Sequence, residues 1–420
     1  MAQDNNKLIA SIDIGTKHTR ILVGELESNG SVHIEGYGKS LSRGVVSGRV
    51  VDINKVADSI SEALNEVNKR LNRKLLIMHF ISSVSDLHMT INNRKGQTPI
   101  KDQKITEKDI ESALFSAAIP NPTNKQIIDT FITSYFIAGQ DINQFEKVPN
   151  PLGLEASGLE LLTHNISISN GAINNIASAV RLANKAEVID FYIESMASAE
   201  AILKQPDKDR GAIIVDIGSN ITSFSIYVDG SIFHNGILDY GGEAISEIIA
   251  QDFAIDVSSA EYLKTNYGKL EANISEIDKL LPLELNIQGK MITKYISSKD
   301  LYASLSEAYD FLLEKLKEEV FSTDNFNYQK IKSGIFLTGG GATIFGIEAK
   351  VRKLFNINVK KGLINRDFIN GEEKILSDAE YSASIGVLNL WLKSQQVNNG
   401  ESVTQKSDIG SKISAWLKNF

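Results

Sequence analysis

Short apolar runs followed by glycine turns recur along this chain of 420 residues. Residues 9–14 form one such run before Gly15, and a second apolar run, residues 19–25, returns directly after the turn. The same order of run, turn and returning run is repeated at residues 212–228. A third run, residues 335–338, leads into a turn of three glycines. Runs of this length bounded by glycine predict buried strands.

Between these strands the apolar positions are spaced as in helices. Asp52 is a candidate N-cap, and Ser258 is predicted to cap a later helix that carries Glu261 and Lys264. The helix after Asp52 has an apolar face that consists of Val56, Ile60, Ala63, Leu64 and Val67. Further helices are predicted at residues 172–186, 195–203, 300–321, 347–355 and 379–392. Strands alternating with helices indicate an α/β protein.

The C-terminal part has a different character. Residues 393–407 are rich in polar side chains and predict a flexible linker. Residues 408–420 then predict a short amphipathic helix, of the kind that lies in a membrane interface. The alternative is an ordinary helix that docks on its own core, and the long linker argues against it. The apolar arc consists of Ile409, Ile413, Trp416, Leu417 and Phe420.

The totals exclude several classes of protein. A formal net charge of −8 argues against nucleic-acid binding, which needs a basic surface. The chain has no cysteine and therefore no disulfide framework. The polar start, residues 1–7, does not resemble a signal peptide, and no run of about 18 apolar residues predicts a membrane span.

The turns carry candidate chemistry. Asp13 and Asp216 each precede a glycine turn, where bare backbone can approach a phosphate closely. A single such turn also fits an ordinary hairpin. Two Asp-x-Gly hairpins followed by a Thr-Gly-Gly-Gly turn resemble the actin–Hsp70–sugar-kinase superfamily. In that superfamily the two hairpins clamp the phosphates of ATP and the third turn packs against the adenosine.

Further segments resemble one branch of this superfamily, the bacterial FtsA family. Its landmarks are matched by the segments Ile14-Gly15-Thr16, Ser42-Arg43-Gly44 and Asn150-Pro151-Leu152-Gly153. Ser85 and His88 match a Ser-Gly-x-His segment, although Asp86 replaces its glycine. The resemblance implies an α/β, actin-like two-lobed fold. Each lobe has a mixed sheet with helices, and an FtsA-type subdomain 1C takes the place of actin's subdomain 1B.

The resemblance also implies a division of the chain. The expected parts are residues 7–84 as the first part of subdomain 1A, 85–163 as subdomain 1C, 164–204 as the second part of 1A, 205–250 as the first part of 2A, 251–330 as subdomain 2B, 331–392 as the end of 2A with a return helix to 1A, 393–407 as the linker and 408–420 as the membrane-targeting helix.

The implied ligand is ATP or ADP with Mg²⁺. Asp13 and Asp216 are expected to hold the metal, mainly through water, since Mg²⁺ prefers oxygen ligands. Glu261 and Lys264 are expected to reach the ribose and base, although an ordinary solvated pair on a helix explains them too. The full set of expected nucleotide-binding residues is Asp13, Gly15, Thr16, Lys17, Asp216, Gly218, Ser219, Asn220, Gly241, Gly242, Glu261, Lys264, Gly339, Gly340, Gly341 and Thr343.

The chain departs from the family pattern at both phosphate turns. Ser219, Asn220 and Ile221 stand where relatives commonly have two glycines and a threonine. His18 stands where the first turn usually has lysine, and Lys17 is expected to serve instead. The sequence therefore predicts nucleotide binding with weak or absent hydrolysis and assigns no catalytic residue.

The resemblance implies partners and a location. Subdomain 2B would bind the C-terminal peptide of the tubulin-like protein FtsZ, and subdomain 1C would contact late division proteins such as FtsN. The protein would associate into filaments and lie on the cytoplasmic face of the inner membrane, at the division site. A PilM-like pilus-assembly protein and a kinase of the same superfamily are the alternatives.

Overall fold

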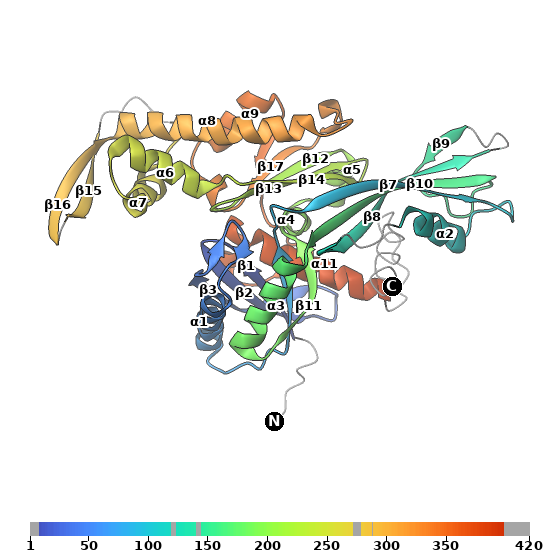
Figure 1. Cartoon of the computed structure of the whole chain (residues 1–420), viewed down its shortest axis with the longest axis horizontal. Helices are drawn as coiled ribbons and strands as arrows, with labels where there is room; N and C mark the ends of the chain where they lie inside the picture. The colour runs from blue at the N-terminus through green and yellow to red at the C-terminus, as the bar shows by residue number, and fades with distance from the viewer. Residues whose placement is uncertain (1–7, 119–122, 140–143, 272–278, 288, 399–420) are drawn as a thin grey trace.

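The chain folds into two lobes with a cavity between them, and a third unit extends to one side (Figure 1). The computed structural model describes residues 8–118, 123–139, 144–271, 279–287 and 289–398. The expected α/β, actin-like fold class is confirmed by this arrangement and by the comparisons below. No helix among the described residues combines the length and apolar character that crossing a bilayer requires.

Lobe I is built on a six-stranded sheet in the order β11-β6-β1-β2-β3-β19. Its core joins the sheet to α1 and α3 on one side, while α4 and α11 cover the other side. Its elements are β1 (Leu8–Ile14), β2 (His18–Leu26), β3 (Val32–Leu41), the small hairpin β4 (Val45–Val46) and β5 (Arg49–Val50), α1 (Ile53–Leu71), β6 (His79–Val84), α3 (Asn170–Asn184), β11 (Glu187–Ile193), α4 (Glu194–Ile202), β19 (Ile369–Asn370), α10 (Glu373–Leu376) and α11 (Ser382–Asn398).

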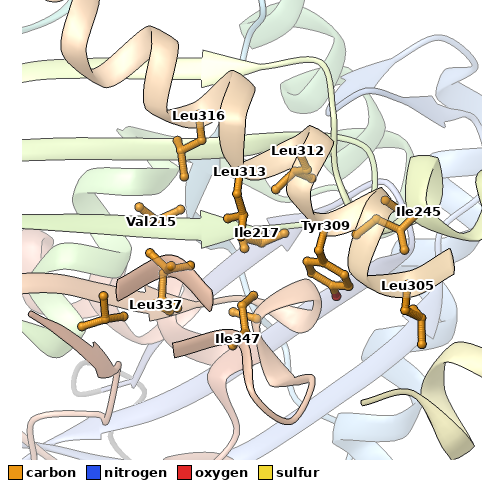
Figure 2. Packing of buried hydrophobic residues seen from close by; sticks show 14 of the residues in the cluster. Val215, Ile217, Ile245, Leu305, Tyr309, Leu312, Leu313, Leu316, Leu337 and Ile347 are labelled. Carbon is orange, nitrogen blue, oxygen red and sulfur yellow. The ribbon is translucent and has the colours of Figure 1, made fainter. Parts of the chain in front are cut away.

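Lobe II is built on a five-stranded sheet in the order β14-β13-β12-β17-β18. The long helix α8 lies across it, and Figure 2 shows Tyr309, Leu313 and Leu316 of α8 against Val215 and Ile217 of β12. The elements are α5 (Gln205–Asp209), β12 (Ala212–Ile217), β13 (Thr222–Val228), β14 (Ser231–Leu238), α6 (Gly242–Phe253), α7 (Val257–Tyr267), the hairpin β15 (Leu280–Ile287) and β16 (Lys290–Ser297), α8 (Ser298–Ser322), β17 (Gly334–Thr338), α9 (Ile347–Phe355) and β18 (Val359–Lys361).

The third unit, called the insert here, is the four-stranded sheet β7-β10-β8-β9 with helix α2 on one face. A buried histidine joins it to lobe II: the ring nitrogens of His164 lie 2.8 Å from Asn93 Oδ1 and 3.0 Å from Asn235 Oδ1 of β14. On the surface, Lys147 Nζ lies 3.1 Å from Asp229 Oδ2. Its elements are β7 (Thr90–Pro99), α2 (Glu107–Ala117), β8 (Lys125–Ala138), β9 (Phe145–Val148) and β10 (Gly158–Ser169).

Local sequence rules explain many element boundaries, with two corrections. Asp52 caps α1 as predicted, since its side chain accepts from the Lys55 N–H. Ser258 was predicted to cap the helix that carries Glu261, but Asp256 is the N-cap, and Ser258 donates its hydroxyl to that carboxylate. The linker predicted at 393–407 is also wrong in its first part, because α11 continues to Asn398. The rest of that linker and the helix at 408–420 lie outside the described residues.

Two helices cross in direct contact where the lobes are joined. Helix α11 runs uninterrupted through Gly386, and a Cβ at that position would lie 1.7 Å from the carbonyl oxygen of Ala197 in α4. Only glycine permits this approach, because backbone cannot move aside as the end of a flexible side chain can. The contact therefore sets the distance between α4 and α11.

We predict that Gly386→Ala lowers the stability of the protein by about 1–3 kcal/mol, as overpacking of a closed interior does. Gly171→Ala in α3 is the matched control, since no atom lies within 4 Å of its Cβ position, and alanine there should be neutral or slightly stabilising. Differential scanning calorimetry of both variants measures the effect. Equal melting temperatures for Gly386→Ala and wild type would show that the helices separate at no cost.

Candidate nucleotide site

A cavity of about 430 Å³ lies between the lobes, where the three glycine turns meet. The first turn joins β1 to β2, the second joins β12 to β13, and the third follows β17. Asn220 and Gly241 are not among its lining residues. The other residues expected from the sequence do line it, namely Asp13, Gly15, Thr16, Lys17, Asp216, Gly218, Ser219, Gly242, Glu261, Lys264, Gly339, Gly340, Gly341 and Thr343.

The first turn is fixed by hydrogen bonds on both sides of the chain. Gly15 N–H donates to the His18 carbonyl, which closes the turn. Thr16 Oγ1 accepts from the N–H of Gly48 at 3.0 Å, so the hairpin β4–β5 is hydrogen-bonded to the turn. Asp13, only 6% exposed, accepts from the Ser83 hydroxyl at 2.7 Å through Oδ1. The carboxylate is therefore set in one orientation before any ligand binds.

The second turn repeats this design in lobe II. Asp216 Oδ2 accepts from the Ser198 hydroxyl at 2.6 Å, and Gly218 N–H donates to the Ile221 carbonyl at 2.9 Å. Gly241 acts from outside the cavity, because a Cβ there would lie 2.5 Å from the Ser219 carbonyl oxygen and would push α6 away from the turn. The side chain of Ile221 lies across the cavity beside Gly48 of lobe I.

The third turn presents bare backbone to the cavity. Gly339 has φ +85°, and a Cβ there would lie 2.2 Å from Asp216 Oδ1. Gly341 packs against Ile217, while its carbonyl accepts from the Tyr309 hydroxyl at 2.8 Å. The contact of Gly339 with Asp216 and that of Gly341 with Ile217 leave no room for a side chain, which explains the glycines at these two positions.

An ion pair spans the cleft. Lys17 Nζ of lobe I lies 2.6 Å from Glu261 Oε1 of α7, and Lys264 Nζ lies 2.6 Å from the other oxygen of Glu261. Burial acts to raise the pKa of Glu261, but the lysines and the Ser246 hydroxyl hold it at about 2. Lys17 is thus engaged by the opposite lobe, whereas the sequence predicted a role at the phosphates.

The structure adds lining residues that the sequence reading missed, chiefly Glu194 and Arg20. Desolvation, with the nearby carboxylates of Asp216 and Asp13, raises the pKa of Glu194 to about 8. Desolvation and Asp13 likewise raise the pKa of Asp216 to about 6, against the effect of Ser198. Glu194 is the first residue of α4, directly after the two buried residues that end β11, and that position was the one local signal of a cavity-facing acid.

The acidic side chains at the cavity suit a cation held mainly through water, because no group of three or more His, Cys, Asp or Glu side chains among the described residues is placed to bind a metal ion directly. The carboxylates of Asp13, Asp216 and Glu194 are hard oxygen donors on one cavity, and such donors suit Mg²⁺. Burial is the main cause of the raised pKa values of Asp216 and Glu194, and neighbouring carboxylates add to it.

Comparison with solved structures defines the class of this protein. The chain is similar to a structure of the PilM-PilN type IV pilus biogenesis complex, with a TM-score of 0.61 and 16% identity over 91% of this chain and 98% of the other. It is also similar to MreB5 of Spiroplasma citri bound to ADP, with a TM-score of 0.57 and 13% identity over 95% of this chain and 100% of the other. The fold is that of the actin-like proteins.

Sequence comparison gives the family. The family model for cell division protein FtsA matches residues 213–386, and the model for the SHS2 domain inserted in FtsA matches residues 87–167. Cell division protein FtsA of Borreliella burgdorferi is 28% identical over 99% of this chain and 98% of its own length. That of Neisseria meningitidis serogroup B is 27% identical over 99% of both. The chain belongs to the FtsA family of actin-like cell-division proteins.

We predict that Lys17→Met widens the cleft. The pair is partly exposed, so it contributes about 1 kcal/mol or less, and its loss should raise the open population up to about fivefold. Because the chain has no native cysteine, spin labels can be placed at Val46→Cys and Tyr262→Cys, one on each side of the cleft. Electron–electron double resonance without ligand should then show a longer mean distance. Lys55→Met, at an exposed lysine of α1 that does not line the cavity, is the control, and an identical shift in both variants would contradict the role of the ion pair.

Proposed function

We propose that this protein is a nucleotide-binding, polymerising actin-like protein of bacterial cell division that attaches the FtsZ ring to the cytoplasmic membrane. The observation that carries the nucleotide part is the meeting of three glycine turns and two carboxylates from opposite lobes at one cavity. The related MreB5 structures, bound to ADP and to AMPPNP, support ATP or ADP as the ligand. Mg²⁺ would accompany it at Asp13 and Asp216.

We further propose that turnover is slow. Ser219 and Asn220 carry side chains where relatives commonly have glycine, and Ile221 offers no hydroxyl. Gly218 and Gly242 still offer bare backbone at this edge of the cavity. The protein would therefore bind the nucleotide but hydrolyse it slowly. Binding needs only a close approach of the backbone to the phosphates, whereas hydrolysis also needs a positioned water at the terminal phosphate.

We predict that ATP with Mg²⁺ raises the melting temperature of the wild-type protein and that Asp216→Ala removes most of this shift. A ligand that binds only the folded state adds RT ln(1 + [L]/Kd), about 2.7 kcal/mol at 100 times Kd. Differential scanning fluorimetry measures the shift, with Asp209→Ala at the surface of α5 as the control. An undiminished shift in Asp216→Ala would contradict the site assignment.

The membrane part of the proposal rests on residues 408–420. Five apolar side chains on one short helix give a gross burial of about 10 kcal/mol before the cost of ordering. One copy would bind weakly and reversibly, and many copies in a filament would bind strongly through avidity. The last described helix, α11, ends at Asn398, which leaves residues 399–407 as the connection between the body and this segment.

The partners follow from the family. We propose that residues 251–330, which include α7, the hairpin β15–β16 and α8, bind the FtsZ C-terminal peptide and that the insert contacts late division proteins such as FtsN. Lys290 at the hairpin is exposed, whereas Lys294 is tied to the Phe253 carbonyl. Lys290 is therefore the more available of the two for an acidic peptide. The location would be the cytoplasmic face of the inner membrane at the division site.

We predict that Trp416→Glu abolishes liposome binding and leaves ATP binding and the melting temperature near wild type. Tryptophan favours the bilayer interface, and a carboxylate within the apolar arc opposes insertion. Ser411→Glu is the matched control, because it adds the same charge on the opposite face of the helix. Co-pelleting with liposomes of anionic and zwitterionic lipid measures binding.

A helix that docks on the body gives the opposite pattern. Trp416→Glu would then lower the melting temperature, and wild type would not pellet with liposomes. That outcome would contradict membrane attachment while leaving the nucleotide site untouched.

A further inference from the structure

The first phosphate turn carries three basic residues, Lys17, His18 and Arg20, and two of them are not available as cations inside the cavity. Lys17 is 45% exposed at its side chain and pairs with Glu261 across the cleft. Burial, with the positive charges of Lys39 and Arg20, lowers the pKa of His18 to about 4. His18 is therefore neutral at neutral pH.

Arg20 differs from both neighbours. It lies on β2, lines the cavity and is only 9% exposed. Nη1 donates to Asp13 Oδ2 at 3.2 Å and Nη2 donates to Glu380 Oε2 at 2.6 Å. Its Nε is buried and has no hydrogen-bond partner among the residues that the structure describes. A buried N–H without an acceptor is costly, so this atom calls for a partner.

The guanidinium lies beside the turn that would receive phosphate. Nη1 is 3.7 Å from the position that a Cβ would occupy on Gly15, on the side of the turn where Asp13 also lies. Lys39 Nζ lies 2.5 Å from Glu380 Oε2 and offsets that carboxylate, so the pairing with Glu380 does not cancel the charge of Arg20. Arginine remains protonated in proteins and offers five N–H donors, more than its two acidic partners use.

We propose that Arg20 is the residue of the first turn that binds the phosphates of the nucleotide, in the place that the sequence assigned to Lys17. The assignment rests on the proposed nucleotide site and deepens it. The ligand class is a nucleotide with at least two phosphates, because a guanidinium beside the first turn would act on the phosphate chain. Glu380, from the turn that precedes α11, holds Arg20 in this position from the opposite side.

The test compares ligands that differ only in phosphate. Isothermal titration calorimetry with Mg²⁺ gives the Kd of ADP and of adenosine for the full chain. Arg20→Met should weaken ADP binding about tenfold or more, since a hydrogen bond to a charged group is worth about 1.5–3 kcal/mol. Adenosine binding should be unchanged. Arg20→Lys keeps the positive charge but not the planar guanidinium group, and its ADP affinity should lie between those of wild type and Arg20→Met.

Two controls separate this role from a structural one. Lys39 is the other cation that pairs with Glu380, but it does not line the cavity. Lys39→Met should therefore change ADP affinity by less than about threefold. Lys17→Met should likewise keep most of the preference for ADP over adenosine. If Arg20→Met does not fold, because Asp13 is left without its partner, Arg20→Lys and Arg20→Gln carry the comparison.

The outcomes are distinguishable. An unchanged ratio of ADP to adenosine affinity in the Arg20 variants, with wild type binding ADP, would overturn the assignment alone. An equal loss for ADP and adenosine would also overturn it, because that pattern indicates a structural role. A loss of ADP preference in Lys17→Met instead would return the role to Lys17. Failure of wild type to bind ADP at all would overturn the nucleotide site and this assignment together.

Discussion

The carboxylates of Asp13 and Asp216 repel each other, yet both are held at one cavity. The elements around the cavity are arranged to meet this constraint. Asp13 comes from lobe I and Asp216 from lobe II, and each is oriented by a serine hydroxyl from a neighbouring element, Ser83 or Ser198. Burial raises the pKa of Asp216, and the nearby carboxylate of Asp13 raises it further. In the proposed nucleotide complex, a cation between the two carboxylates would offset this repulsion.

The sequence predicted the elements well because the signals for them are local. The strand–turn–strand units, the Asp52 cap and the apolar face of α1 depend on residues a few positions apart. The cap of α7 was misplaced because Ser258 and Asp256 compete for one role, and a carboxylate accepts N–H bonds better than a hydroxyl does. The end of α11 was misplaced because Lys393 pairs with Glu200 of α4, a contact that no local pattern shows.

The cavity was predictable only in part, for the same reason. Glycines and aspartates at turns stand out in a sequence, whereas Arg20 reads as one polar residue in an apolar strand. Its role depends on Glu380, which is 360 positions away. Asp86 was noted as a departure from the family motif, and the structure explains it. Its carboxylate accepts from the N–H and hydroxyl of Ser169, the N-cap residue of α3, so Asp86 orients this cap.

The insert is joined to lobe II by polar groups buried away from water. Asn235 donates to Ser225 Oγ at 2.7 Å, and the Ser225 hydroxyl donates to Ser195 Oγ of α4 at 2.8 Å. Burial lowers the pKa of His164 to about 4, so the ring at this junction stays neutral at neutral pH. Such groups are costly to separate, because each would lose its partner without gaining water. The junction therefore resists sliding of the insert over β14.

Strand β8 has 14 residues, and its two ends lie in different hydrophobic cores. Ile128 packs in the core of lobe I, while Tyr135 packs in the core of the insert. At about 3.3 Å per residue the strand is about 45 Å long, and β10 runs antiparallel beside it over most of that length (Figure 1). The pair forms an extended two-stranded unit whose inner end packs in the core of lobe I. Because of this length, a small rotation of the pair at its lobe I end moves the outer end through a larger distance.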